Sequence, residues 1–377
     1  MGAGATTKVG IIAASGLFCG VLLSWPLWYP DARSGIPLLP APGFEGFESI
    51  PGALQASLFV ALLIARILLP GRRWISALLL LVLTILCLLD VNRLQPWVWF
   101  YGLVLALLLG GKKGPAPDAV SALRLVLTAV YVWGGFNKLT PYFAEDNFPW
   151  FCEAFAPLRL LGQFPLLGYG VALFEMALGI GLLLPKTRLY TRYVAIGFHG
   201  FIALALSPLG LHWNTVAIPW NFAMAALLWL LFSEKERVVL PKHPVALLLI
   251  ALAWLAPALN FFRAWPDALS WKMYSNTQPE ATFYTHGGPP CAAVQAVWKA
   301  SAFDEGRNLL LDDWSQADLH TPLYTSRRTF MQLGRYLCHC ADNQDSAGIY
   351  ILTVNRWNKR QEGIERIPCK QIMMNGE

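Results

Sequence analysis

The chain has 377 residues, a formal net charge of +6, and a composition in which 56% of the residues are hydrophobic and only 14% are charged. An ordinary soluble protein carries roughly 25% charged residues, so this composition excludes a typical soluble enzyme. Apolar runs of about 18 residues or more recur along the chain, which is the pattern of transmembrane helices. The positive charge lies in short loops between these runs, which argues against a nucleic-acid-binding surface.

Nine apolar segments are expected to form transmembrane helices. In chain order they cover residues 9–28, 53–69, 74–89, 96–109, 119–138, 165–184, 189–206, 213–232 and 244–262. A signal peptide is the alternative for the first segment, but the stretch at residues 24–30 lacks the small-residue cleavage site of such peptides. The sequence therefore predicts an all-α polytopic bundle of about nine helices over residues 1–262.

The charged loops between these segments predict the orientation of the bundle. Every second loop is basic, through Arg72, Arg73, Lys112, Lys113, Lys186, Arg188, Arg192, Lys235, Arg237 and Lys242. The positive-inside rule places these loops in the cytoplasm. The opposite loops are acidic, through Asp31, Glu45, Glu48, Glu145, Asp146 and Glu153. They also carry an expected interfacial belt of Trp25, Trp28, Trp97, Trp99, Trp150 and Trp213. We expect an integral membrane protein with a cytoplasmic N-terminus.

The composition changes after residue 262, where the chain becomes polar and no further spanning run occurs. Residues 263–377 are expected to form a small extracytoplasmic α+β domain. Runs at 282–285 and 349–354 are rich in β-branched and aromatic residues, which favours strands. Residues 323–337 are expected to form a helix that carries Arg327, Arg328 and Arg335.

Four of the seven cysteines lie in this C-terminal region, at Cys291, Cys338, Cys340 and Cys369. An oxidising compartment favours disulfides, and four cysteines allow three pairings. The alternative is a metal site formed by Cys338, Cys340 and His286, because thiolates and imidazoles are zinc ligands. We expect at least one disulfide and no bound metal. Cys19, Cys87 and Cys152 are expected to be unpaired packing residues.

Three polar side chains fall inside the predicted helices. At about 1.5 Å per residue, Glu175 and His199 lie near the middle of consecutive segments, and Asn221 lies somewhat above the middle of the next. A carboxylate and an imidazole at similar depth can pair and lower each other's cost of burial. The pair is either a packing clamp or a pocket that binds a head group or relays protons. Arg124 is the alternative partner of Glu175, and His212, in an outer turn, is either a titrating group near Lys138 or a solvated loop residue.

Lys138 ends the segment Tyr131-Val-Trp-Gly-Gly-Phe-Asn-Lys-Leu139, where the apolar run stops. A lysine at such a point is either a snorkelling anchor or a base, because an apolar pocket disfavours the charged form of an amine. Gly134 and Gly135 allow a helix or a ligand to approach the backbone closely.

This segment, together with Glu175 and with Phe198 and His199 on the next helix, resembles the membrane domain of vitamin K-dependent γ-glutamyl carboxylase, known as the HTTM domain. The resemblance covers roughly residues 50–235. That family has a tyrosine-aromatic-x-x-Gly-x-x-Lys-Leu segment whose lysine is the base toward a reduced quinone, which implies the same role for Lys138. We expect Glu175 and His199 as further catalytic residues. The expected cofactor site consists of Trp133, Gly134, Gly135, Asn221 and His212.

Three functions remain open at this point. The first is a quinol-dependent oxidase or carboxylase-like enzyme that acts at the extracytoplasmic face with a reduced quinone as cofactor. The second is a non-catalytic subunit of a quinone or electron-transfer complex, through a looser resemblance of the Gly-x-x-Lys pattern to DoxX-type membrane proteins. The third is a membrane anchor that presents the C-terminal domain to a partner. Expected partners are membrane lipid, a quinone, and a secreted peptide or redox protein, but no nucleic acid.

Overall fold

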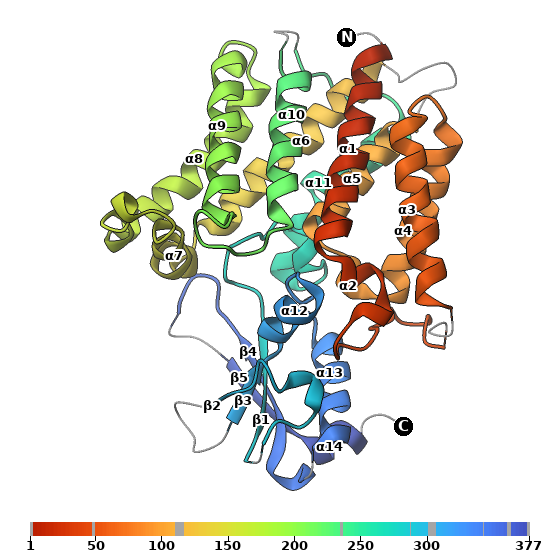
Figure 1. Ribbon diagram of the computed structural model, residues 1–377. Coiled ribbons are helices and arrows are strands. Elements are labelled where there is room, and N and C mark those ends of the chain that lie inside the picture. The colour runs from red at the N-terminus through yellow and green to blue at the C-terminus, as the bar shows by residue number, and fades with distance from the viewer. Residues whose placement is uncertain are drawn as a thin grey trace.

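A computed structural model of the chain describes residues 3–46, 50–109, 117–233, 237–286, 288–300, 307–341, 343–359 and 363–374. It consists of a helical bundle with a smaller C-terminal domain at one end (Figure 1). Helix α1 starts at the end of the bundle that lies far from this domain. The predicted loop charges Glu48, Lys112, Lys113 and Lys235 lie outside the described residues.

Each predicted apolar segment contains a helix in the described part of the chain. These helices are α1 (Ala3–Leu23), α3 (Gly52–Leu68), α4 (Arg73–Leu89), α5 (Pro96–Leu107), α6 (Pro117–Lys138), α8 (Pro165–Leu183), α9 (Arg188–Leu206), α10 (Ala217–Leu231) and α11 (Pro244–Trp254). Five stretches are long and apolar enough to cross a membrane, namely Gly4–Leu23, Ala119–Lys138, Pro165–Leu183, Arg188–Leu206 and Pro244–Phe262. The apolar helices α3, α4, α5 and α10 are shorter.

The first predicted segment is divided, because α1 stops at Leu23 and a separate short helix, α2 (Trp25–Trp28), follows it. Ser24 between them has a non-helical backbone, with φ −113° and ψ 43°. Pro26 has no N–H, so it cannot make the bond to the fourth preceding carbonyl that an unbroken helix would need. The side chain of Ser24 donates to the carbonyl of Gly20 at 2.8 Å and stabilises the end of α1.

Two of the tryptophans assigned to the interfacial belt belong to the core. Trp28 is 1% exposed and Trp97 is 6% exposed. Trp28 stacks on Phe59 with 4.8 Å between ring centroids. The wide, flat ring of Trp28 fills the junction between α2, α3 and α5, where burial gains more free energy than a place at the interface.

Two of the basic side chains assigned to loops, Arg188 and Arg192, are buried in the bundle. Arg188 is 1% exposed, and its Nε donates to the carbonyl of Leu182 at 2.8 Å. It thereby satisfies a carbonyl at the C-terminus of α8, where a positive charge is also favoured by the helix dipole. Arg33 and Asp90 form a buried ion pair at 2.5 Å near the other end of the bundle.

The C-terminal domain is an antiparallel sheet with helices beside it. The strands are β1 (Glu280–Thr285), β2 (Lys299–Ala300), β3 (Arg307–Leu310), β4 (Ala347–Thr353) and β5 (Gly363–Pro368), in the order β2-β3-β1-β4-β5. The helices are α12 (Leu311–Leu319), α13 (Arg327–Cys340) and α14 (Cys369–Met374). The strands predicted at 282–285 and 349–354 are confirmed by β1 and β4, except that β4 ends at Thr353, one residue before the end of the predicted run. The predicted helix at 323–337 starts later, because Ser326 caps it by accepting from the N–H of Thr329 at 3.0 Å.

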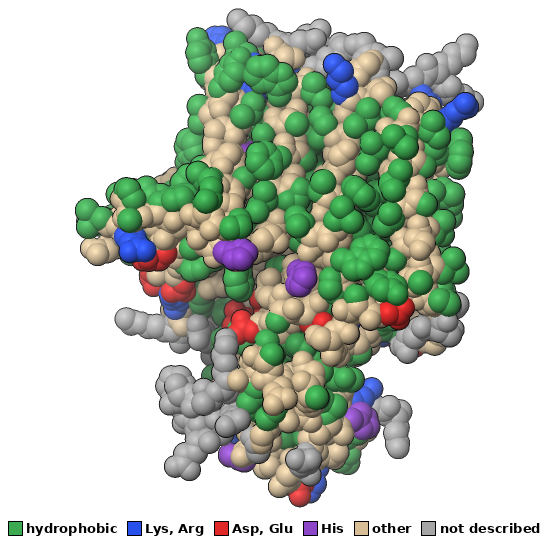
Figure 2. Space-filling view, viewed as in Figure 1, with side chains coloured by type: hydrophobic (Ala, Val, Ile, Leu, Met, Phe, Trp, Pro, Cys, Tyr) green, Lys and Arg blue, Asp and Glu red, His purple; other side chains and the backbone are tan. Residues whose placement is uncertain are grey.

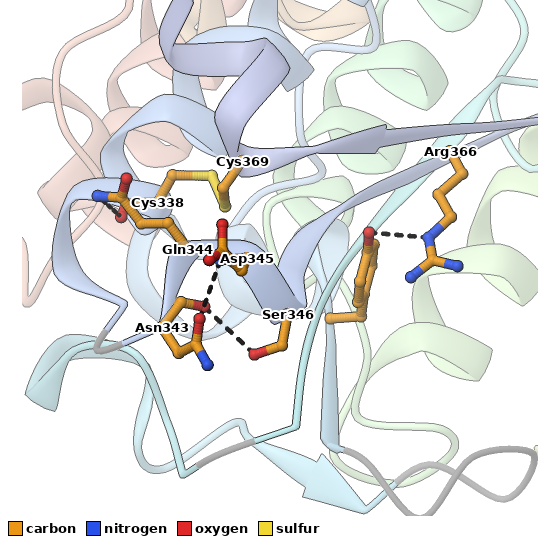
Figure 3. Close-up of a disulfide and its surroundings, with 8 residues drawn as sticks. Cys338, Asn343, Gln344, Asp345, Ser346, Arg366 and Cys369 are labelled. Carbon is orange, nitrogen blue, oxygen red and sulfur yellow. Dashed lines mark hydrogen bonds between the residues drawn. A yellow bond between two sulfur atoms is a disulfide. The ribbon is translucent and has the colours of Figure 1, made fainter.

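Two disulfides, Cys291–Cys340 and Cys338–Cys369, cross-link this domain. Figure 3 shows the second one beside the turn that contains Asn343 and Ser346. The prediction of at least one disulfide is confirmed. Because Cys338 and Cys340 belong to different disulfides, neither is a thiolate that could ligate a metal. Cys87 and Cys152 are buried free thiols, as expected for unpaired packing residues, whereas Cys19 is a free thiol but is exposed, so its predicted packing role is wrong.

Asp318 on α12 docks the C-terminal domain on the bundle. Its carboxylate accepts from the N–H groups of Ser34, Gly35 and Ile36 at 2.6–2.9 Å, and from the hydroxyl of Ser34 at 2.8 Å. The hairpin between β4 and β5 makes a second connection, because Arg356 donates to the side chain of Asn137 at the end of α6. The bundle and the C-terminal domain are therefore connected at two separate places.

Candidate functional site

A cavity of about 740 Å³ lies where the bundle meets the C-terminal domain. Its inner walls come from α6, α8, α9 and α10 and from the turn formed by a π-helix (Phe143–Asn147) and α7 (Phe148–Cys152). Its outer wall comes from residues 267–281 and from α12, α13 and the loop between them. Acidic side chains gather along this boundary on the face shown in Figure 2. Mostly apolar walls with a few convergent polar groups are typical of ligand sites.

Lys138 and Glu175 form a buried ion pair on the inner wall. The side chain of Lys138 turns back along α6, so that Nζ donates to Glu175 Oε2 at 2.8 Å and to the carbonyl of Gly134 at 3.3 Å. Lys138 is 8% exposed and Glu175 is 7% exposed, and both line the cavity. A Cβ atom on Gly134 would lie 2.6 Å from Glu175 Oε1, so the glycine is what makes room for this carboxylate.

His199 lines the same cavity but has different partners from those predicted. Its Nε2 lies 2.5 Å from the hydroxyl of Tyr131, and its Nδ1 lies 2.7 Å from Oδ1 of Asn221. In the described part of the chain, the predicted pair Glu175 and His199 has no direct hydrogen bond; Glu175 accepts from Lys138 instead, because the Lys138 side chain reaches back one helical turn. Arg124, the alternative partner of Glu175, donates to the carbonyl of Leu231 at 2.6 Å.

Ionisable groups from the C-terminal domain line the outer wall. Lys272 Nζ lies 2.5 Å from Asp267 Oδ1, and burial lowers the pKa of Lys272, an effect that the charge of Asp267 opposes. Asp312 accepts from the N–H of Leu323 at 2.8 Å, and burial raises the pKa of this carboxyl group. Burial also raises the pKa of Tyr324 to about 12, so its hydroxyl group stays protonated near neutral pH.

The outer wall contains an unusually strained backbone. Trp271, Tyr274 and Asn276 have φ values of 58°, 58° and 53°, a region that non-glycine residues rarely adopt. Asparagine side chains hold the segment in place: Asn137 donates to the carbonyl of Ser270 at 2.7 Å, and Asn147 donates to the carbonyl of Tyr274 at 2.6 Å. Such strain persists only where the surroundings fix it, and it clusters at functional sites.

Four of the eight residues predicted for the site line the cavity, namely Lys138, Glu175, His199 and Asn221. Gly134 does not line the cavity, but its carbonyl accepts a hydrogen bond from Lys138. Gly135 packs on α8, and Trp133 faces α11, where its Nε1 donates to the carbonyl of Trp254 at 2.9 Å. His212 is exposed in a turn with φ 49°, while the next residues, Trp213 and Asn214, line the cavity instead.

The site predicted from the sequence did not include Tyr131 as a polar residue, and it did not include the outer wall. Tyr131 begins the segment that the family resemblance singles out, and its position seven residues before Lys138 was the available signal, because this spacing returns to the same helix face. The outer wall is brought to Lys138 only by the tertiary fold, more than a hundred residues later in the chain.

No group of three or more His, Cys, Asp or Glu side chains in the described ranges is arranged to hold a metal ion. The chain matches no protein-family model, no curated protein and no solved structure. The chemistry of the cavity is therefore the basis for assigning a function. It offers two lysine–carboxylate pairs, Lys138–Glu175 and Lys272–Asp267, a hydrogen-bonded series of tyrosine, histidine and asparagine, and aromatic walls.

Proposed function

We propose that the chain is a multi-pass membrane protein whose cavity binds a reduced quinone, and that Lys138 accepts a proton from a hydroxyl group of this ligand. The observation that carries the proposal is the buried Lys138–Glu175 pair on the wall of the cavity. A lysine and a carboxylate without chemical use are costly to keep in an apolar bundle, so such residues mark functional sites.

In the proposed topology all nine apolar helices span the membrane and the C-terminal domain lies outside. On the face shown in Figure 2, several Lys and Arg side chains lie at the end of the bundle away from the C-terminal domain, and others lie beside acidic side chains near that domain. Acidic side chains lie at the opposite end, next to that domain. This distribution agrees with the positive-inside rule and supports an extracytoplasmic position of the cavity.

The residues of the cavity fit the ring of a quinone. Phe148, Phe151, Phe174 and Phe198 provide aromatic surface on the inner walls, and Lys138 and Glu175 provide hydrogen-bonding groups. Aromatic rings favour stacked or edge-to-face contacts with a planar ligand. When bound, a reduced quinone would supply the two electrons of the oxidation that the family resemblance implies.

The Lys138–Glu175 pair can hold a proton in two ways. In the ion-pair form Lys138 carries the proton and cannot accept another. Transfer of that proton to Glu175 leaves a neutral amine beside a neutral acid. The neutral amine then accepts the proton of a ligand hydroxyl group, while Glu175 keeps its own proton.

Replacement of Lys138 by arginine or alanine tests this proposal. Arginine keeps the charge and the anchor, but guanidinium does not release its proton, so it cannot act as a base. Loss of a general base typically slows a reaction by about 10²- to 10⁴-fold, and we expect this loss in both variants. The measurement is oxygen consumption with decylubiquinol by purified protein in lipid nanodiscs. Lys186→Arg, at an exposed position, is the matched control.

Full activity in correctly inserted Lys138→Arg protein would remove Lys138 from the chemistry and leave it as an anchor. A wild-type protein that neither binds nor oxidises decylubiquinol would overturn the quinone proposal as a whole. That second result would leave the roles of a non-catalytic subunit and of a membrane anchor.

A further inference from the structure

We infer that Tyr131 and His199 form a second proton acceptor in the same cavity, so that the site serves a ligand that gives up two protons. The inference rests on the proposed function, because it assigns the handling of the second hydroxyl group of a reduced quinone. It is carried by the direction of the hydrogen bonds that join Tyr131, His199 and Asn221.

Asn221 determines the direction of these hydrogen bonds. Nδ2 of Asn221 donates to the carbonyl of Ala217 at 2.7 Å, so Oδ1 is the atom that faces His199. An amide oxygen only accepts, and therefore Nδ1 of His199 carries the hydrogen. A neutral imidazole with its hydrogen on Nδ1 has a bare Nε2, which accepts the hydrogen of the Tyr131 hydroxyl group.

This arrangement turns Tyr131 into an acceptor toward the cavity. Its single hydrogen is committed to His199 at 2.5 Å, so only oxygen lone pairs remain for a ligand. Tyr131 lines the cavity and is 2% exposed, so few water molecules compete for these lone pairs. A ligand hydroxyl group satisfies Tyr131, whereas a ligand carbonyl group does not.

Proton transfer along the hydrogen bonds from the ligand through Tyr131 to His199 is balanced in atoms and charge. The hydroxyl proton of the ligand passes to the oxygen of Tyr131 while the hydrogen of Tyr131 passes to Nε2 of His199. His199 becomes an imidazolium with hydrogen on both nitrogens, and Asn221 Oδ1 still accepts from Nδ1. The ligand oxygen is left with the negative charge, and no electron is gained or lost in this step.

The two acceptors face one space. Tyr131 and Lys138 are seven residues apart on α6, which places both on the same side of the helix. Lys138 Nζ reaches back to the carbonyl of Gly134, and thus toward Tyr131. Glu175 from α8 belongs to the acceptor formed with Lys138, and His199 from α9 belongs to the acceptor formed with Tyr131. A reduced quinone carries two hydroxyl groups and must lose both protons on oxidation, which matches two separate acceptors.

The experiment compares the affinity of the protein for decylubiquinol and for decylubiquinone in nanodiscs. Tyr131→Phe removes the acceptor oxygen but keeps the ring. We expect about a tenfold weaker affinity for the quinol, the usual effect of one lost hydrogen bond, and an unchanged affinity for the quinone. Tyr101→Phe is the matched control, because Tyr101 is 1% exposed but does not line the cavity; it should change neither affinity.

Equal weakening of both ligands by Tyr131→Phe would show a packing role and overturn the inference, and so would an unchanged affinity for the quinol. A wild-type protein that binds neither form overturns the proposed function together with the inference. The inference fails, and the proposed function stands, when the wild type binds the quinol and the quinone with different affinities and Tyr131→Phe shows the same difference in affinity.

His199→Gln provides a second variant that does not depend on the tyrosine ring. Glutamine still hydrogen-bonds to Tyr131, but it cannot hold an additional proton. We expect quinol binding within about threefold of the wild type and oxidation at least about 10²-fold slower, because a proton acceptor is lost while the packing is kept. An unchanged oxidation rate in this variant would contradict the assigned role of His199.

Discussion

Two adjacent glycines in α6 have different tasks. Gly134 leaves space for the carboxylate of Glu175, whereas Gly135 is the point at which the backbone of α6 meets α8. A Cβ atom on Gly135 would lie 2.5 Å from the carbonyl oxygen of Ala172 and 2.7 Å from the backbone nitrogen of Met176. Backbone atoms cannot move aside as a flexible side chain can, so any larger residue at 135 has to separate the helices.

Gly135→Ala is therefore expected to lower the free energy of unfolding by about 1–3 kcal/mol, the usual cost of overpacking. The buried free thiols Cys87 and Cys152 allow a direct measurement, because a thiol-reactive dye labels them when the bundle unfolds on heating. Gly170→Ala on α8 is the control, since a Cβ atom there would meet nothing within 4 Å. Equal unfolding temperatures for the two variants would contradict the close contact.

The sequence could predict which polar residues enter the bundle, but not their partners. Counting along a helix gives the depth of Glu175 and His199, whereas their pairing also depends on the rotation of each helix about its axis. Depth alone favours Glu175 with His199. The fold turns Glu175 toward Lys138 and brings Tyr131 to His199.

At the scale of elements, the apolar segments were predictable because a long hydrophobic run has few alternatives to a helix. The errors occur where a single residue changes the backbone. Pro26 interrupts the first helix, and the positive φ values of His212 and Asn214 delay the start of α10 to Ala217. In the C-terminal domain, the cap at Ser326 sets the start of α13.

Cysteine pairing was not predictable, because three arrangements satisfy the same spacing. The buried Cys338–Cys369 disulfide joins α13 to the first residue of α14. We expect Cys338→Ser combined with Cys369→Ser to lower the free energy of unfolding of this domain by about 2–5 kcal/mol.

Thermal unfolding followed by near-ultraviolet circular dichroism measures this loss. Cys19→Ser provides the control, because Cys19 is an exposed free thiol. A double variant as stable as the wild type would show that packing around the two cysteines is sufficient without the covalent bond.

At the scale of the whole molecule, Asp318 connects residues that are more than 280 positions apart in sequence. The carboxylate of Asp318 accepts hydrogen bonds from the N–H groups of residues 34–36. Asp318→Asn replaces one of its oxygens by an NH₂ group, which cannot accept a hydrogen bond from an N–H group. Hydrogen bonds to a charged group contribute about 1.5–3 kcal/mol, so amide exchange at residues 34–36 should accelerate by about 10- to 100-fold.

Hydrogen–deuterium exchange with mass spectrometry resolves this segment. The control is Asp345→Asn, which removes a carboxylate from an exposed pair with Lys370. Unchanged exchange at 34–36 in Asp318→Asn would mean that the domain is docked mainly by other contacts.

The proposed topology has its own test. A periplasmic reporter such as alkaline phosphatase, fused after Met374, is expected to be active, because the alternation of basic and acidic ends places this residue outside. The same reporter inserted after Arg72 should be inactive. The reverse pattern would invert the bundle and place the cavity on the cytoplasmic side.

The composition of the cavity wall has a consequence for biosynthesis. The ribosome completes α6, α8, α9 and α10 before it makes the residues of the outer wall, which lie within 267–281 and 312–330. A newly inserted bundle therefore carries Lys138 and Glu175 in a site that is still open to water. In the proposed orientation, only export and folding of the following segment can cover them. In the proposed mechanism, Lys138 would therefore become an effective base only after the outer wall has folded, and a bundle that is still being synthesised would be inactive.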